Sequence, residues 1–185
     1  MNEAQTELEL IDPALKQAGW GVVEGSKIKK QFPISQGRLL VGGKKSQPLK
    51  ADYVLQYKHR NVAVIEAKAD EKHYTEGVGQ AKDYAQRLHI RYTYSTNGVQ
   101  IYQMDMDKGK EEDVFKYPTP DELWEMVYGE EDNAEPEVAQ WRDTLHSVPF
   151  QTKSGTWSPR YYQEVAISKV LEGIAKGQKR MLLPL

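Results

Sequence analysis

Two carboxylates and one ammonium group stand on or beside two apolar runs between residues 51 and 68. Asp52 lies at the start of the first run, and Glu66 and Lys68 lie at the end of the second. Two carboxylates on rigid strands suit Mg²⁺, which keeps several waters and also binds substrate phosphate. We therefore predict a divalent metal site that cleaves a phosphodiester. Lys68 would orient the attacking water or stabilise charge in the transition state.

The elements that position these side chains are predicted from the apolar pattern. Residues 62–68 alternate and are rich in β-branched side chains, which predicts a strand, and residues 52–57 form its hairpin partner. Strand side chains repeat every second residue, so Glu66 and Lys68 share a face, and hairpin pairing brings Asp52 beside them. The alternative is a solvated Glu66–Lys68 pair on a half-exposed strand. The apolar flanks favour the metal site, because buried charges are rarely left unpaired.

A second pair of polar residues lies on the predicted helix 75–88. Gln80 and Tyr84 are four residues apart, so they occupy one face of that helix. If this face looks towards the metal site, the amide and the phenol would contact DNA or orient the attacking water. The alternative is a core tyrosine beside an exposed glutamine.

The remaining elements predict an α/β fold with a central mixed sheet flanked by helices. Pro13 predicts a kink or restart near Asp12 in the first helix, and Gly19 its end. In chain order we predict a helix over 3–18, an extended segment from 20–23, a strand over 38–41, a strand over 91–96, an Asn97-Gly98 hairpin leading into 99–104, a helix over 118–128 capped by Thr119 or Asp121, an acidic loop over 129–136, a helix over 160–176 and an apolar strand from 179 to the chain end.

Composition restricts the class of protein. The 185 residues suffice for one domain with a core, and no apolar run approaches the ~18 residues that span a membrane. The chain has no cysteine, which excludes disulfide scaffolds, thiol catalysis and cysteine-based zinc sites, and we expect a cytoplasmic protein. The net charge is only −2, but residues 16–60 carry 10 Lys/Arg against two acids. A basic first third beside the metal site suits a phosphate backbone.

The combined pattern resembles a known nuclease superfamily. An Asp…Glu-x-Lys pair of strands followed by Gln-x-x-x-Tyr on the next helix resembles the PD-(D/E)xK nucleases. More narrowly, the chain is similar to the N-terminal endonuclease domain of the R (restriction and motor, HsdR-like) subunit of type I restriction-modification enzymes. The stretches that carry this resemblance are 3–20, 51–55, 63–68 and 80–98.

The resemblance implies roles for individual residues. Asp52 and Glu66 would bind Mg²⁺, or Mn²⁺ in its place, and Lys68 would be catalytic. Gln80 and Tyr84 would belong to the auxiliary motif of the family. Glu3 would be a further metal ligand from the first helix, with Glu7 as the open alternative.

The resemblance also implies partners and a substrate. The substrate would be unmodified double-stranded DNA, cut after ATP-driven translocation. The partners would be the methylation (M) and specificity (S) subunits, with no membrane involved. Two alternatives stay open: a nuclease-like domain that binds DNA or acts as a scaffold without cleaving, and the nuclease domain of another helicase-nuclease.

The C-terminal stretch 159–167 is similar to the Gln-containing motif that precedes the first ATPase motif of superfamily 2 helicase motors. Gln163 would be its adenine-contacting residue. No phosphate-binding Gly-x-x-x-x-Gly-Lys-[Ser/Thr] loop is present, so ATP would bind only to a longer protein. We therefore predict an endonuclease domain over 1–140, a linker over 141–158 and the start of a motor domain over 159–185.

Overall fold

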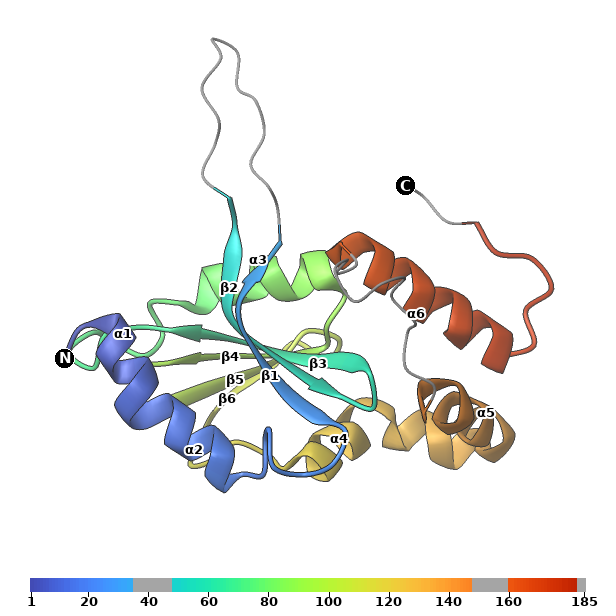
Figure 1. Ribbon diagram of the computed structural model, residues 1–185, viewed down its shortest axis with the longest axis horizontal. Coiled ribbons are helices and arrows are strands. Elements are labelled where there is room, and N and C mark those ends of the chain that lie inside the picture. Colours follow the sequence, from blue (N-terminus) through green and yellow to red (C-terminus); the bar gives the residue numbers. More distant parts are fainter. Residues whose placement is uncertain (35–47, 148–159, 183–185) are drawn as a thin grey trace, which may run out of the picture.

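The structure is a computed structural model that describes residues 1–34, 48–147 and 160–182. Its centre is a six-stranded mixed sheet in which the strands follow one another in chain order (Figure 1). β3 and β4 are parallel, and every other neighbouring pair is antiparallel. The strands are β1 (Ser26–Pro33), β2 (Lys50–Tyr57), β3 (Arg60–Ala67), β4 (Tyr92–Thr96), β5 (Ile101–Asp105) and β6 (Lys110–Val114).

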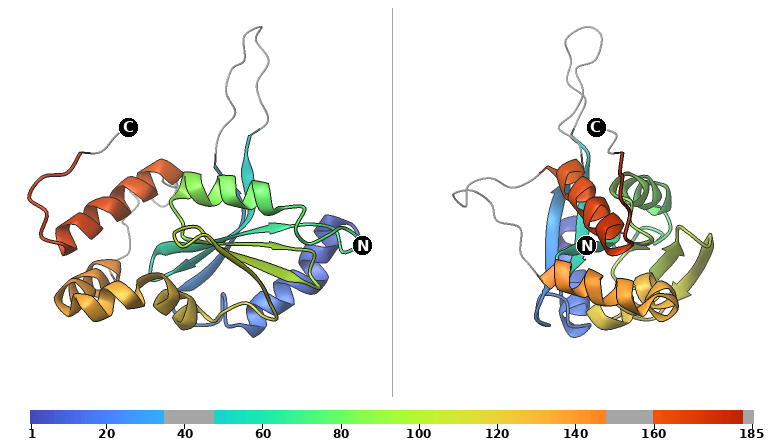
Figure 2. Two further views of the ribbon diagram at one scale, coloured as in Figure 1. Left: turned by 180° about the vertical axis from the view of Figure 1, so that it is seen from behind. Right: turned by 90° about the vertical axis from the view of Figure 1, so that its right-hand side faces the viewer.

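Helices cover both faces of this sheet, which confirms the predicted α/β fold. The N-terminal helix and α4 lie on one face and α3 lies on the other, while α5 and α6 lie beyond one end of the sheet (Figures 1 and 2). The helical elements are α1 (Glu3–Thr6), the π-helical turn η1 (Glu7–Ile11), α2 (Asp12–Gln17), α3 (Val78–Leu88), α4 (Pro120–Ala134), α5 (Pro136–Ser147) and α6 (Tyr161–Ala175).

The β2–β3 hairpin has the predicted pairing and forms the centre of the core. Tyr53 pairs with Ile65, and both pack with the N-terminal helix and α4. Val54 and Val64 pair with each other and pack against α3 on the opposite face. Because strand side chains alternate, Glu66, two residues after Val64, points to the α3 side of the sheet.

The first helix restarts near Asp12, as predicted from Pro13. The restart takes the form of a π-helical turn, in which the Asp12 N–H donates to the carbonyl of Glu7. The helix ends before Gly19, which has a φ of +96°. The predicted extended segment from residue 20 is wrong: residues 20–25 form turns around the buried Trp20, and the strand begins at Ser26.

The predicted acidic loop over 129–136 is also wrong. α4 continues to Ala134 because its acidic side chains find basic partners, such as Glu130 with Lys108 and Glu131 with Arg142. Residues 141–147, predicted as linker, belong to α5. Residues 179–182 form no strand, and the predicted strand over 38–41 and residues 148–159 and 183–185 lie outside the described residues. The domain boundaries themselves stay a prediction.

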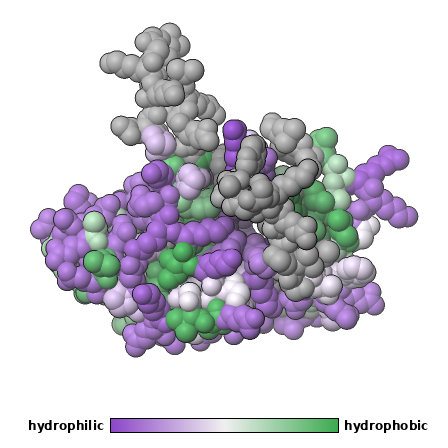
Figure 3. Space-filling model, viewed as in Figure 1, coloured by the Kyte–Doolittle hydropathy of each residue, from purple (hydrophilic) through white to green (hydrophobic). Residues whose placement is uncertain are grey.

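The face drawn in Figure 3 is mostly hydrophilic, with small separate hydrophobic areas. Within the described ranges, no helix combines the length and the apolar character needed to span a bilayer.

Candidate metal centre

The β2–β3 hairpin brings the predicted catalytic side chains together. Oδ2 of Asp52 accepts a hydrogen bond of 2.9 Å from the backbone N–H of Ala67, the residue after Glu66. Oε1 of Glu66 accepts a hydrogen bond of 2.8 Å from Nζ of Lys68. The other oxygen of Glu66, Oε2, is buried and has no hydrogen-bond partner among the described residues. Glu66 is only 2% exposed, so a buried acceptor is left unsatisfied at the centre of the site.

The electrostatics of this group show an excess of negative charge. The pKa of Glu66 is raised to about 8: burial is the largest cause, the neighbouring Asp52 carboxylate also raises the pKa, and Lys68 opposes both effects. For Lys68, burial lowers the pKa, but Glu66 and the more distant acids outweigh burial, so the net pKa is raised. One ammonium group therefore does not neutralise the carboxylates around it.

The first helix adds two more acids. Single carboxylate oxygens of Glu3, Glu7 and Asp52 all lie within 4.8 Å of one another. Burial and the charge of Asp52 raise the pKa of Glu7, although Nζ of Lys30 lies 3.9 Å from its carboxylate. Both first-helix acids thus reach Asp52, with Glu3 exposed and Glu7 partly buried.

These donors fit a hard divalent cation. They are carboxylate oxygens held on rigid elements, which Mg²⁺ prefers over nitrogen or sulfur. Glu66 does not belong to the group of three within 4.8 Å, but its unpartnered Oε2 supplies a free ligand atom beside Asp52. The residues that would hold the ion are therefore Asp52 and Glu66, with Glu3 and Glu7 from the first helix.

Gln80 and Tyr84 share a face of α3, as predicted from their spacing. Nε2 of Gln80 donates a 2.9 Å hydrogen bond to the hydroxyl of Tyr84. Burial raises the pKa of Tyr84, and the charges of Glu66 and Asp52 raise it further. Tyr84 is therefore a core residue whose hydroxyl lies close enough to the Glu66 and Asp52 carboxylates for their charges to affect its pKa. Gln80 is exposed.

One residue near Asp52 gave no signal in the sequence. Nε2 of Gln31 donates a 3.3 Å hydrogen bond to Oδ1 of Asp52. Gln31 has a φ of +50°, which costs a non-glycine residue energy and recurs at functional sites. Its strand, β1, is mostly polar, so apolar periodicity did not reveal it.

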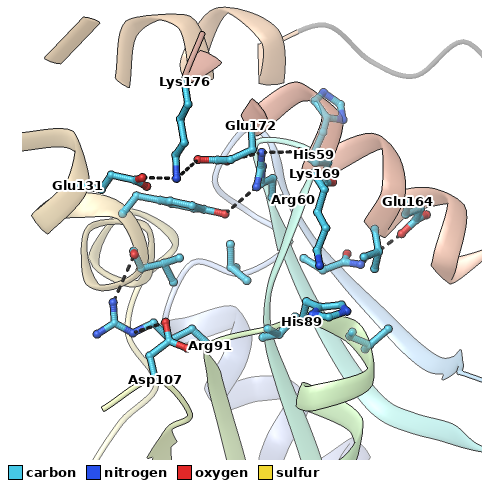
Figure 4. Close-up of a pocket in the computed structure, with 18 residues that line it drawn as sticks. His59, Arg60, His89, Arg91, Asp107, Glu131, Glu164, Lys169, Glu172 and Lys176 are labelled. Atoms are coloured by element: carbon cyan, nitrogen blue, oxygen red, sulfur yellow. Dashed lines mark hydrogen bonds and ion pairs between the residues drawn. The ribbon is translucent and has the colours of Figure 1, made fainter. Parts of the chain in front are cut away.

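A separate cavity lies away from this centre. It has a volume of about 520 Å³ and lies between the start of β3, the end of α3 and α6 (Figure 4). Its lining includes none of the carboxylates of the candidate metal centre. Gln163, predicted to contact adenine, lies in the first turn of α6. Its Oε1 accepts a 2.9 Å hydrogen bond from the backbone N–H of Arg160, and its role stays a prediction.

Comparison with known proteins shows that the chain is similar to subunits of type I restriction enzymes. The family described as the second domain of the type I restriction enzyme EcoKI endonuclease subunit matches residues 40–120. The type I restriction enzyme EcoAI endonuclease subunit of Escherichia coli is 30% identical to the chain over 200 residues. A solved fragment of a putative HsdR subunit of a type I restriction enzyme from Vibrio vulnificus YJ016 is 32% identical, with a TM-score of 0.80. The three matches support an HsdR N-terminal endonuclease domain, and the chain resembles endonuclease subunits of type I restriction enzymes over nearly its whole length.

The chain corresponds to only part of the length of these relatives. The chain is covered to 99% by the EcoAI match and to 97% by the Vibrio match, but spans only 23% and 34% of those two HsdR-type chains. The family match over 40–120 includes all five residues predicted as catalytic, whereas Glu3 and Gln163 lie outside it.

Proposed function

We propose that this chain is the Mg²⁺-dependent DNA endonuclease domain of a type I restriction enzyme. The observation that carries the proposal is the buried Oε2 of Glu66, which has no hydrogen-bond partner in the described part of the chain and lies beside the Asp52 carboxylate and the Lys68 ammonium. A charged carboxylate in such a place is costly, so it either takes up a proton beside Asp52 or is compensated by a cation. Similarity to the endonuclease subunits of type I restriction enzymes supports nuclease chemistry at this site.

Each residue of the site has a distinct task. Asp52 and Glu66 would hold the ion, and the hydrogen bond from the Ala67 N–H to Asp52 orients that carboxylate. Mg²⁺ bound there would supply polarisation of a phosphoryl oxygen and a lower pKa of water. Lys68, whose side chain is 15% exposed, reaches the site opening and stabilises negative charge on the reacting phosphate or orients the attacking water.

The auxiliary residues act on the substrate side. Gln80 is exposed and donates to Tyr84, so its amide lies at the rim, where it contacts the DNA backbone or the attacking water. Glu3 and Glu7 on the first helix complete the ring of carboxylates. We assign no residue of this chain to the recognition of specific bases.

The proposal extends to the parts of the enzyme outside this chain. The relatives are subunits of restriction enzymes. We infer that the complete subunit works with methylation and specificity subunits, and that ATP-driven translocation by motor domains brings unmodified DNA to this site.

The decisive experiment is DNA cleavage by the complete enzyme assembled with those subunits. Supercoiled unmodified plasmid is incubated with Mg²⁺ and ATP, and both nicking and ATP hydrolysis are measured. Asp52→Asn and Lys68→Ala should lower cleavage by roughly 100-fold or more and leave ATP hydrolysis unchanged. Lys72→Ala is the matched control, because Lys72 is an exposed lysine nearby that pairs with Glu76. Undiminished cleavage by both site variants would instead support the scaffold interpretation.

A further inference from the structure

The start of α3 lies directly on the candidate metal centre at a residue without a side chain. Gly77 is the buried N-cap residue of α3, and it precedes the auxiliary residue Gln80 by three positions. Its backbone has φ −83° and ψ −6°, which L-residues with a side chain also adopt. The backbone conformation therefore does not require glycine here, and another reason must be sought in the surroundings.

The surroundings leave no room for a Cβ atom. A Cβ built on Gly77 would lie 2.8 Å from Cγ of Glu66, 3.2 Å from Cε of Lys68 and 2.7 Å from Oγ of Ser95. Non-bonded carbon atoms prefer separations of about 3.5–4.0 Å. The two carbon contacts are with the side chains of the proposed metal ligand and the proposed catalytic lysine.

These neighbours are not free to move aside. The hydroxyl of Ser95 donates to the backbone carbonyl of Tyr74, which fixes it between β4 and the loop before α3. The side chain of Glu66 is buried and bonded to Lys68, so displacing one shifts the other. Relief of the clash would therefore move the Glu66 carboxylate.

We propose that Gly77 is a positioning residue of the nuclease site, because only the absence of a side chain lets α3 pack on Glu66 and Lys68 in their observed geometry. This inference rests on the proposed function. Metal sites require ligands held within about 0.5 Å of their productive position. Gly77 thus contributes to the metal centre through van der Waals contact with Glu66 and does not itself bind the ion.

The same helix supplies a matched control. A Cβ at Gly79, two residues along α3, would meet nothing within 4 Å. Gly77→Ala and Gly79→Ala therefore make the same chemical change in the same helical turn, and only the first touches the site.

The test is a calorimetric titration of Mn²⁺ into the 185-residue chain. Wild type and Gly79→Ala should bind the ion with equal affinity, and Glu66→Gln should bind it much more weakly. Gly77→Ala should bind it about 10- to 100-fold more weakly than wild type, as removal of other supporting contacts does at metal sites. Its far-UV circular dichroism spectrum should match that of wild type, which separates loss of the site from loss of the fold.

Two results would overturn different claims. Equal Mn²⁺ affinity of Gly77→Ala and wild type, with Glu66→Gln weakened, would refute the role of Gly77 alone. Equal affinity of Glu66→Gln and wild type would refute the metal site of the proposed function. If Gly77→Ala does not fold, the double variant Gly77→Ala/Ser95→Ala relieves one contact. The proposal expects this variant to remain weak, and wild-type affinity in it would contradict contact with Glu66 as the cause.

Discussion

Glu66 is the proposed metal ligand whose burial also destabilises the folded protein. Its side chain is buried, one of its oxygens has no hydrogen-bond partner among the described residues, and Asp52 adds a like charge. Such an arrangement favours the protonated acid unless a cation is bound. Without metal, the site is therefore a source of instability at neutral and alkaline pH.

This cost predicts a pH dependence. The pKa of Glu66 is raised to about 8 in the folded protein, above the usual 4.5, so the folded state binds a proton that the unfolded state releases. Stability should therefore fall as pH rises from about 4.5 to 8 and then level off. Glu66→Gln removes this effect, so its stability relative to wild type should increase by roughly 1–3 kcal/mol between pH 6 and pH 8.

Urea unfolding in the presence of a chelator measures this difference. The matched control is Glu76→Gln, because Glu76 is exposed and its pKa is lowered, so its titration lies below this pH window. A stability difference between Glu66→Gln and wild type that stays constant from pH 6 to pH 8 would show that Glu66 does not titrate there.

The sequence revealed the residues that carry charge but not those that hold them in place. Asp52, Glu66 and Lys68 were predictable because strand periodicity and hairpin pairing determine which side chains meet. Glu3 and Glu7 were given as alternatives, whereas carboxylate oxygens of both lie near Asp52. Their spacing of four residues, which places both on one face of a helix, is the signal that the prediction did not use. Gln31 and Gly77 were not predictable, because a polar strand and a glycine without special φ carry no periodic signal.

At the scale of elements, one acid of the first helix adds polar contacts to the apolar packing of that helix on the sheet. Oδ1 of Asp12 accepts a 2.9 Å hydrogen bond from the hydroxyl of Tyr53, which is fully buried on β2. Oδ2 of Asp12 accepts a 2.6 Å hydrogen bond from Nζ of Lys30 on β1. Lys30 also lies 3.9 Å from Glu7, so the π-helical turn brings Asp12 to the same side of the helix as a proposed metal ligand.

This attachment predicts coupling between Asp12 and Tyr53. Asp12→Ala should lower the free energy of unfolding by about 2 kcal/mol, because it leaves the buried Tyr53 hydroxyl without its acceptor. Adding Tyr53→Phe removes that hydroxyl, so the double variant should lose less than the sum of the two single variants. Urea unfolding of all four proteins gives the coupling energy, which we expect to be about 1 kcal/mol. Strict additivity would mean that the hydrogen bond does not hold the helix.

Sequence patterns identified the inner elements better than the outer ones. β2, β3 and β4 are largely buried, β2 and β3 carry apolar runs, and β4 is made of aromatic, threonine and serine residues, so all three were recognisable as strands. The two edge strands were missed because β1 and β6 are rich in charged side chains, as edge strands often are. The end of α4 was mistaken for a loop because an acidic run resembles a solvated segment until its basic partners are known. Residues 141–147, the second half of α5, were mistaken for a linker because they show no strong apolar periodicity.

At the scale of the whole molecule, a buried ion-pair network holds α6 to the rest of the domain. Arg142 of α5 is 1% exposed and bonds Glu131 at 2.6 Å and Glu172 at 2.8 Å. Glu172 also pairs with Arg60 at the start of β3, and Lys176 lies beside it (Figure 4). Three helices and the sheet therefore meet through charges that are costly to leave unpaired.

Removal of the Arg142 guanidinium, which is shared by Glu131 and Glu172, should detach α6 from the rest of the domain. Arg142→Ala should cost about 3 kcal/mol of stability, because Glu172 and Glu131 lose a buried partner. Amide hydrogen exchange in α6 should become faster than in α3. The control is Arg87→Ala, an exposed arginine paired with Asp83 along α3, which should change stability by no more than about 0.5 kcal/mol. Equal effects of the two variants would show that the network does not fix α6.

The most direct test of the metal centre is a crystal of the chain soaked in Mn²⁺ and measured for anomalous scattering. We predict one strong peak at about 2.1 Å from Oε2 of Glu66 and from a carboxylate oxygen of Asp52, with a first-helix acid facing the same ion. A peak that lies beyond reach of Glu66, or no peak at millimolar Mn²⁺, would contradict the proposal that this buried carboxylate binds the catalytic ion.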